Sequence, residues 1–264
     1  MGIEGYHAVV TGAGRGLGAA AARRLAAEGA RVVLADIDGE SAIATARSID
    51  PAGRQATGMA CNIADPADCA ALVSQSEAFF GAPIDIFVAH AGVGFAGSLL
   101  DATPEAIRRT IEINVLGSIF SAQAALRSLV RSPRACLLIT GSLQGVTARP
   151  QRSAYTTSKH AIVGLVKSLA LEFGPQGVRV NSIAPASTDT PHLRAQLARE
   201  SDDIDHAVAQ LGTTMPLGRL PSAEDFADAV VFLASPGSRS ITGHTLLVDC
   251  GASAGIVKRQ DLLS

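Results

Sequence analysis

Short apolar runs alternate with longer amphipathic runs along this 264-residue chain, and this alternation restricts the fold more than any other feature. Apolar runs without internal polar residues, such as residues 137–139, are typical of strands covered on both faces. Strands that alternate with helices predict an α/β fold with a doubly wound parallel sheet and helices on both faces. We predict about seven strands, at residues 7–11, 31–36, 56–61, 84–89, 134–140, 178–183 and 244–249. We predict helices near residues 16–28, 39–48, 66–80, 104–131, 153–173 and 223–234.

Length and composition fit a single domain over residues 1–264, because α/β domains often exceed about 200 residues. A net charge of −2 and a pI of about 6.3 provide no basic footprint for nucleic acid. The N-terminus does not resemble a signal peptide, and no apolar run approaches about 18 residues. We therefore expect a cytoplasmic protein that binds neither nucleic acid nor membrane. Four irregularly spaced cysteines give no reason to expect a metal site: Cys61, Cys69, Cys136 and Cys250.

Residues 186–217 interrupt the alternation of strands and helices. This segment is long, contains charged helical pieces and lies between a strand and the next core helix. Because long segments in that position often close over a site, we interpret residues 186–217 as a substrate lid. The alternative is a solvated helical insertion without a role.

A glycine-rich turn, Thr11-Gly-Ala-Gly-Arg-Gly-Leu-Gly18, follows the first predicted strand and opens the first helix. Glycines let the backbone turn tightly and approach a pyrophosphate, whose charge the helix N-terminus stabilises. The strand before the turn and the helix after it make this a strong indication of a Rossmann-type dinucleotide site. The residues of the turn that we expect to contact the cofactor are Gly12, Arg15, Gly16, Leu17 and Gly18.

Asp36 ends the second predicted strand. An aspartate at that place accepts hydrogen bonds from the adenosine ribose hydroxyls and repels a 2′-phosphate, which favours NAD over NADP. Arg15 works against this preference if it meets a 2′-phosphate, but it can equally contact the pyrophosphate or face water. We give Asp36 the greater weight, and we include the next residue, Ile37, among the predicted cofactor contacts.

Tyr155 and Lys159 are four residues apart and so share one face of a predicted helix. An ammonium beside a phenol favours the phenolate, so we expect the pKa of Tyr155 to fall from about 10 toward neutrality. Such a tyrosine exchanges a proton with an alcohol or a ketone. Alone, this spacing suits a surface tyrosine beside an unrelated lysine. The glycine-rich turn, Ser142 after a predicted strand and Asn114 within a predicted helix favour the catalytic interpretation.

In their order and spacing, these motifs resemble the classical short-chain dehydrogenase/reductase family over almost the whole chain. The resemblance extends through Ala91-Gly92, Asn181-Ser-Ile-Ala-Pro185 and Gly243-His-Thr-Leu-Leu-Val-Asp249. It implies an oxidoreductase that transfers a hydride between NAD(H) and a small secondary alcohol or ketone. It also implies a homotetramer, or at least a dimer, paired through the long helices at 104–131 and 153–173.

The resemblance further implies roles for single residues. Tyr155 is the general acid/base, and Ser142 hydrogen-bonds the substrate oxygen and stabilises its developing charge. Lys159 binds the nicotinamide ribose and lowers the pKa of Tyr155, while Asn114 holds a water in a proton relay. Since asparagine is a poor helix former, Asn114 within an apolar helix also indicates a specific hydrogen bond. The other cofactor contacts that the resemblance implies are Ala91, Gly92, Pro185, Thr188 and Thr190, the last three in a loop that closes on the nicotinamide carboxamide.

The chain departs from the family pattern at four positions. His90 stands where an asparagine is usual, and we expect it to line the cofactor pocket and support the sheet. The alternative is a histidine that titrates near pH 6.5 and makes cofactor affinity depend on pH. Asn62, in place of an aspartate, is expected with Ile63 to lie over the adenine, although a role as a turn residue is an alternative for Asn62. Ala186 and Cys250 replace glycines outside the proton-transfer residues.

The sequence leaves two other functions open: an NADP-dependent ketone reductase, and a dinucleotide-sensing protein that has the same fold without turnover. The intact set of four proposed catalytic residues favours an enzyme. The identity of the alcohol or ketone stays open, and we expect its pocket to be apolar, with contacts from residues 93–98, 143–152 and the lid. Arg149, Arg152 or Arg194 either meets an anionic group or is a solvated surface charge.

Overall fold

Seven parallel strands form one sheet, in the order β3-β2-β1-β4-β5-β6-β7. The computed structural model describes residues 2–198 and 201–255. The strands are β1 (His7–Thr11), β2 (Arg31–Asp36), β3 (Ala56–Ala60), β4 (Ile86–Ala89), β5 (Cys136–Thr140), β6 (Arg179–Pro185) and β7 (Thr245–Val248). All seven predicted strands are confirmed, and so is the single doubly wound α/β domain.

The two faces of the sheet pack against separate hydrophobic layers. On β1, Val9 packs in one cluster with Phe87 and Leu137, while its neighbour Val10 packs in the other with Phe226. Successive side chains of a strand point to opposite faces, so a strand that is covered on both faces needs apolar residues at every position. This is the physical reason for the uninterrupted apolar runs in the sequence.

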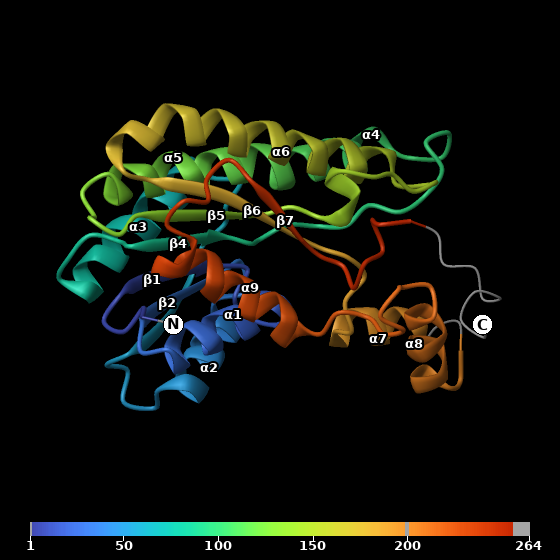
Figure 1. The fold of residues 1–264 in the computed structure, drawn as a ribbon, viewed down its shortest axis with the longest axis horizontal. Coiled ribbons are helices and arrows are strands. Elements are labelled where there is room, and N and C mark those ends of the chain that lie inside the picture. Colours follow the sequence, from blue (N-terminus) through green and yellow to red (C-terminus); the bar gives the residue numbers. More distant parts are fainter. Residues whose placement is uncertain (1, 199–200, 256–264) are drawn as a thin grey trace.

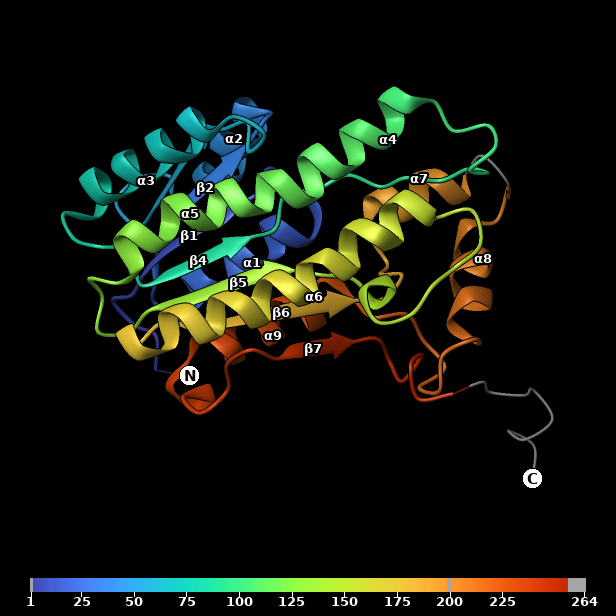
Figure 2. The same ribbon diagram turned by 90° about the horizontal axis from the view of Figure 1, so that it is seen from above.

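Helices cover both faces of the sheet, as Figures 1 and 2 show. One layer contains α1 (Gly16–Ala27), α2 (Gly39–Ile49) and α9 (Ala223–Ala234). The other contains α3 (Pro66–Phe80), α4 (Pro104–Ile111), α5 (Gly117–Leu129) and α6 (Ser153–Phe173). Short 3₁₀ turns occupy Leu143–Gly145, Gly174–Gln176 and Pro236–Ser238. Within the described ranges, no helix has both the length and the apolar character of a transmembrane span.

The segment between β6 and α9 forms two further short helices, α7 (Pro191–Leu197) and α8 (Ile204–Gly212). They lie beyond the carboxyl ends of the strands, side by side in both views (Figures 1 and 2). Asp203 begins α8 by accepting a hydrogen bond from the backbone N–H of His206 at 2.9 Å. The helical pieces expected within residues 186–217 are therefore present at the edge of the sheet where ligands bind in such folds.

The helix predicted for residues 104–131 is not continuous. After α4 the chain makes a π-helical turn, Glu112–Leu116, and only then continues as α5. A π turn inserts one additional residue into the helix, and such turns often mark functional positions. Here it contains Asn114. The turn is followed by Gly117, where a Cβ atom would lie 2.8 Å from the side chain of Ile63, so α5 approaches the β3–α3 connection closely.

Candidate active site

The glycine-rich turn lies at the carboxyl end of β1, which is flanked by β2 and β4. The strand order reverses here, because β2 and β3 follow on one side of β1 and β4 begins the other side. Gly12 and Gly16 have positive φ angles, of 67° and 58°, which glycine adopts without steric cost. At Gly18 a Cβ atom would lie 2.2 Å from the carbonyl oxygen of Gly12. The turn can therefore close only with glycine at that position. Ligands bind at this point of reversal in open α/β sheets.

The N-terminus of α1 fits the phosphate groups of a dinucleotide. The residue before the helix, Arg15, gives α1 no side-chain cap, whereas Asp38 and Asp65 accept backbone hydrogen bonds at the starts of α2 and α3. The first backbone N–H groups of a helix lack partners within the helix, and together with the helix dipole they attract an anion. Leu17 packs against the core and so fixes the helix behind the turn.

Asp36, at the end of β2, is part of the same turn. One carboxylate oxygen accepts a hydrogen bond from Gly14 N–H at 2.9 Å, and the other accepts from Asp38 N–H at 3.0 Å. The neighbouring Ile37 is 74% exposed, which leaves an apolar surface free at this strand end. The Arg15 guanidinium lies 3.9 Å from the Asp38 carboxylate, so a second acid in this region attracts its charge.

Asn62 and Ile63 follow β3 and behave differently from each other. Asn62 is exposed, and its side-chain oxygen accepts a hydrogen bond from Ala64 N–H at 3.1 Å. It therefore does serve as a turn residue, the alternative considered for it. The Ile63 side chain is buried and packs toward Gly117. The contact of these two residues with the adenine stays a prediction.

His90 lies beneath the glycine-rich turn at the end of β4. Its Nδ1 is 3.1 Å from the Thr140 hydroxyl, and a Cβ atom on Gly18 would lie 2.8 Å from the His90 ring. Burial and, to a smaller extent, the charge of Lys159 together lower the pKa of His90 to about 4. His90 supports the sheet as expected, and its lowered pKa contradicts the alternative of titration near pH 6.5. Its place in the cofactor pocket stays a prediction.

The segment after His90 is held by side chains from two other elements. Thr11 Oγ1 accepts hydrogen bonds from His90 N–H and Ala91 N–H, at 3.0 and 3.2 Å. Asn114 forms a pair of hydrogen bonds with Val93: its Oδ1 accepts from Val93 N–H at 2.8 Å, and its Nδ2 donates to Val93 O at 2.9 Å. The specific hydrogen bond expected for Asn114 is confirmed. Gly92, between the two attachments, stays exposed.

Tyr155 and Lys159 lie on α6 as expected, but their electrostatics differ from the prediction. Lys159 is 6% exposed, its Nζ donates to the carbonyl oxygen of Thr140 at 2.9 Å, and Nζ is 5.8 Å from the centre of the Tyr155 ring. Burial raises the pKa of Tyr155, although a hydrogen bond with Ser142 and the charge of Arg152 both oppose that rise. The predicted fall in the Tyr155 pKa is therefore wrong, because desolvation outweighs the favourable interactions.

Burial also lowers the pKa of Lys159, to about 8. Ser142 is buried near Tyr155, and its hydroxyl oxygen accepts a hydrogen bond from Gln144 N–H at 3.2 Å. The structure thus brings a serine hydroxyl, a phenol and an ammonium together at the carboxyl ends of β5 and the start of α6. This is a set that can hydrogen-bond a substrate oxygen and exchange a proton with it.

Two residues that sequence reasoning did not single out connect this set. Ser158 receives a hydrogen bond from Asn114 Nδ2 at 3.1 Å and donates one to the Tyr155 carbonyl at 2.7 Å. Thr140 contacts His90 through its hydroxyl and Lys159 through its carbonyl. Ser158 lies three residues after Tyr155 on the same helix, so its helical position is a usable signal. The backbone contact of Thr140 leaves no signal in the sequence.

The predicted carboxamide loop follows β6. Pro185 is the last residue of β6 and pairs with Val248 of β7. Thr188 is buried, and its hydroxyl donates to Ala186 O at 3.0 Å. The Thr190 hydroxyl accepts from Leu193 N–H at 3.3 Å at the start of α7. Both hydroxyls are therefore engaged within the loop, and they fix the point where the chain leaves the sheet for α7.

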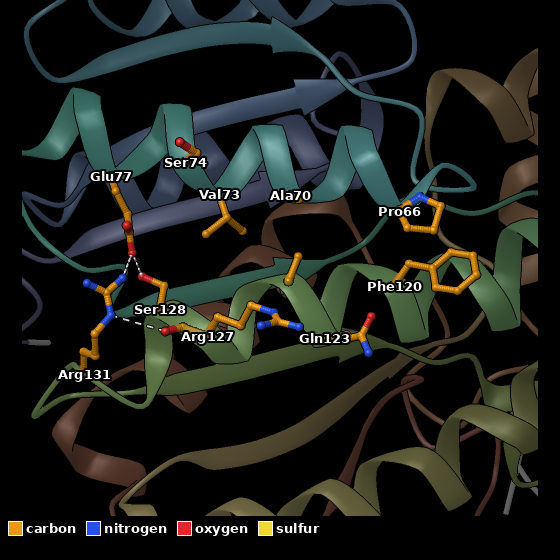
Figure 3. Close-up of a pocket in the computed structure, with 11 residues that line it drawn as sticks. Pro66, Ala70, Val73, Ser74, Glu77, Phe120, Gln123, Arg127, Ser128 and Arg131 are labelled. Atoms are coloured by element: carbon orange, nitrogen blue, oxygen red, sulfur yellow. Dashed lines mark hydrogen bonds and ion pairs between the residues drawn. The ribbon is translucent and has the colours of Figure 1, made fainter.

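A separate groove of about 400 Å³ lies between α3 and α5, as Figure 3 shows. Glu77 accepts a hydrogen bond from Ser128 and pairs with Arg131 there. None of the predicted site residues lines this groove. In the part of the chain that the structure describes, no three His, Cys, Asp or Glu side chains are grouped so that they could hold a metal ion.

Comparisons with known proteins agree with this geometry. A family model described as enoyl-(acyl carrier protein) reductase matches residues 12–253. A cis-4-hydroxycyclohexanecarboxylate dehydrogenase from Sinomonas cyclohexanicum is 35% identical, over 94% of this chain and 96% of the relative. The structure of a short-chain type dehydrogenase/reductase from Mycobacterium marinum is 32% identical, covers 96% of this chain and 97% of its own, and has a TM-score of 0.86.

A further similar structure holds a cofactor. It is a 3-ketoacyl-(acyl-carrier-protein) reductase from Brucella melitensis in complex with NADH, 31% identical, with a TM-score of 0.84 and coverage of 95% of this chain and 99% of its own. The fold and these similarities define an oxidoreductase that uses a nicotinamide dinucleotide. The chain belongs to the short-chain dehydrogenase/reductase family.

The position of His90 leads to a testable prediction. With a pKa of about 4, below its ordinary value of about 6.5, His90 stays neutral at pH 6 to 8, and we expect NADH affinity to vary by less than about twofold there. The stability that neutral His90 contributes is present above about pH 6.5 and is lost as the pH falls toward 4. Fluorescence titrations and thermal unfolding of wild type and His90→Asn measure both effects. A step in affinity near pH 6.5 that vanishes in His90→Asn contradicts this assignment.

Proposed function

We propose that this protein is an NAD-dependent dehydrogenase/reductase that interconverts a secondary alcohol and the corresponding ketone. The observation that carries the proposal is the grouping of Ser142, Tyr155 and Lys159 at the same sheet edge as the glycine-rich turn. Bound NAD supplies the hydride acceptor. A sensor protein without turnover has no need of an acid/base pair beside its cofactor, which favours an enzyme.

In alcohol oxidation the carbinol C–H bond breaks with its two electrons, and the hydroxyl proton goes to Tyr155. Ser142 stabilises the charge that develops on the substrate oxygen. The raised pKa of Tyr155 keeps its phenol protonated at neutral pH, the state that donates a proton to a ketone. Reduction is therefore supported near pH 7, and oxidation is expected to accelerate as the pH rises and the phenolate forms.

Two further residues are proposed to support this chemistry, Lys159 on α6 and Asn114 in the π turn. Lys159 is proposed to hold the nicotinamide ribose, and its hydrogen bond to the Thr140 carbonyl keeps its ammonium beside the Tyr155 ring. Asn114 is proposed to take part in the proton relay from Lys159 to solvent. Its hydrogen bonds with Val93 also keep the Gly92 backbone beside the Lys159 ammonium. A Cβ atom on Gly92 would lie 3.8 Å from the Lys159 Nζ and 3.1 Å from the Asn114 oxygen.

The preference for NAD rests on the charges at the end of β2. Asp36 and Asp38 are neighbours, and their only close cation among the described residues is the exposed Arg15, 3.9 Å from Asp38. A ribose 2′-phosphate at that place meets two carboxylates, whereas a ribose hydroxyl donates to Asp36. The proposed cofactor contacts are those expected from the sequence, with Asn62 and Ile63 over the adenine.

We propose that residues 186–217 form the lid over the substrate. Arg194 on α7 pairs with Asp189 at 2.7 Å and with Asp205 on α8 at 2.8 Å. These ion pairs join the start of the segment to α7 and α8. The Sinomonas relative is named for a ring alcohol that carries a carboxylate, and we propose a small cyclic or branched secondary alcohol as the substrate class.

A homotetramer, or at least a dimer, is proposed from one face of α6. Ala161, Gly164, Ser168 and Leu171 are exposed on that face, with Leu171 81% exposed. A Cβ atom on Gly164 would have no atom within 4 Å. Small residues at successive turns with an apolar residue at the end allow another helix to approach closely, and an exposed apolar stripe favours association.

Tyr155→Phe tests the proposed chemistry. Without its hydroxyl the protein cannot exchange the proton, so we expect kcat for alcohol oxidation to fall about 100- to 10,000-fold, with NADH affinity within about threefold of wild type. Absorbance of reduced nicotinamide measures turnover on a panel of secondary alcohols. Retention of the wild-type rate would refute the role of Tyr155, and tight NADH binding without turnover of any alcohol or ketone would favour the sensor.

Asp36→Asn tests the cofactor preference. The amide oxygen can keep only one of the two backbone hydrogen bonds of Asp36, from Gly14 N–H or from Asp38 N–H. Because the negative charge is gone, we expect the ratio of kcat/KM for NADP to that for NAD to rise about tenfold or more. Asp101→Asn, a change at an exposed acid distant in sequence, serves as the matched control and should leave the ratio unchanged. Wild-type enzyme that uses NADP as well as NAD at equal concentrations would show that the preference is wrong.

Gly164→Arg tests the assembly. The added side chain meets open space within one subunit but blocks the approach of a second α6, so we expect the mass in light scattering to fall while the circular dichroism of the fold is kept. Gln75→Arg, at an exposed position of α3, is the control and should keep the wild-type mass. A wild-type protein that is monomeric at micromolar concentration rules out the proposed assembly.

A further inference from the structure

Three arginines lie in segments expected to contact the substrate, and their surroundings in the structure differ. Arg194 is engaged by two carboxylates, those of Asp189 and Asp205. Arg149 is exposed to solvent. Arg152 is half-buried, unlike Arg149, and it directly precedes Ser153, the first residue of α6.

Arg152 lies three residues before Tyr155, at the start of α6, and its guanidinium is held by a backbone contact. Its Nη1 donates to the carbonyl oxygen of Phe95 at 3.0 Å. Beside this contact, Gly97 N–H donates to Gln151 O at 2.9 Å, so the segment after β4 and the segment before α6 are joined at two points. Gln151 has a φ of 59°, a conformation rare for a residue with a side chain. The position of the guanidinium is thus fixed by backbone structure on both sides.

The guanidinium lies close enough to the reacting group to affect its acidity. Its positive charge lowers the pKa of Tyr155, against the larger effect of burial. Across residues 2–198 and 201–255 no carboxylate forms an ion pair with Arg152, whereas Arg15, Arg194 and Arg219 each pair with at least one carboxylate. Phe95 O accepts from a single N–H, and a guanidinium has five N–H donors in a planar fork.

We propose that Arg152 binds an anionic group of the substrate, a carboxylate or a sulfonate, and that the preferred substrates are hydroxy acids and the corresponding oxo acids. This deepens the proposed function and rests on it. Arginine binds such groups with two parallel hydrogen bonds, which fixes orientation as well as charge. Phe95 and Leu143 are apolar residues of the same two segments. They suit a hydrocarbon spacer between the anionic group at Arg152 and the hydroxyl at Tyr155.

The test compares each acid with its neutral ester. The substrates are cis- and trans-4-hydroxycyclohexanecarboxylate, 3-hydroxybutyrate, the methyl esters of all three, and cyclohexanol. In wild type we expect a higher kcat/KM for at least one acid than for its ester. In Arg152→Gln the ratio of acid to ester should fall roughly 10- to 100-fold. Any change in Tyr155 acidity affects both substrates alike and cancels in the ratio.

Two variants serve as controls. Arg152→Lys keeps the charge without the fork and should retain part of the preference. Arg149→Gln removes the exposed arginine of the same segment and should leave the acid-to-ester ratio within about twofold of wild type. Calorimetric binding of cyclohexanecarboxylate to the protein with NADH provides a readout that needs no turnover, and it should weaken in Arg152→Gln alone.

The outcomes separate this inference from the proposed function. Turnover of cyclohexanol and of the esters, with no preference for any acid and no effect of Arg152→Gln on cyclohexanecarboxylate binding, overturns the role of Arg152 and leaves the dehydrogenase intact. Equal loss of activity on acids and esters in Arg152→Gln overturns it as well. Absence of turnover on every alcohol is a failure of the proposed function, and the binding measurement then decides the anion site alone.

Discussion

The buried ammonium of Lys159 is the constraint on which the site depends. A charged group that leaves water needs compensating partners, since its loss of hydration is costly. Lys159 donates to the carbonyl of Thr140 at the end of β5, and Thr140 in turn contacts His90 beneath the glycine-rich turn. This chain of contacts joins α6 to the strand ends beneath the glycine-rich turn. Tyr155, one turn before Lys159, is thereby placed relative to both.

The fold was largely predictable from the sequence, because burial in the fold determines where apolar residues recur along the chain. A strand that is buried on both faces must be apolar throughout, and Val9 and Val10 illustrate this by packing into opposite layers. The glycine-rich turn was equally readable, since Gly18 leaves no room for a Cβ atom. The π turn at Glu112–Leu116 was not, because its residues have the same apolar pattern as a regular helix. What distinguishes it is the pair of hydrogen bonds between Asn114 and a segment distant in the sequence.

The sequence predicted the shared helix of Tyr155 and Lys159 but not the solvent access of their side chains. The spacing of Tyr155 and Lys159 gave their shared helix face, but spacing says nothing of solvent access, so the direction of the Tyr155 pKa was wrong. The same limit applied to His90, whose pKa of about 4 follows from burial. Contacts through backbone atoms, such as Lys159 with Thr140 and Arg152 with Phe95, depend on tertiary structure and leave no trace in residue type.

The extra residue in the π turn has a consequence for how this chain tolerates changes in length. The widened turn takes up the additional residue, so the helix after it keeps its rotational register. Deletion of one residue within Glu112–Leu116 would therefore restore a regular helix with the buried face of α5 still toward the sheet, and the loss would fall on Asn114 and its hydrogen bonds with Val93. The extra residue thus serves the position of Asn114, whereas the packing of α5 does not depend on it.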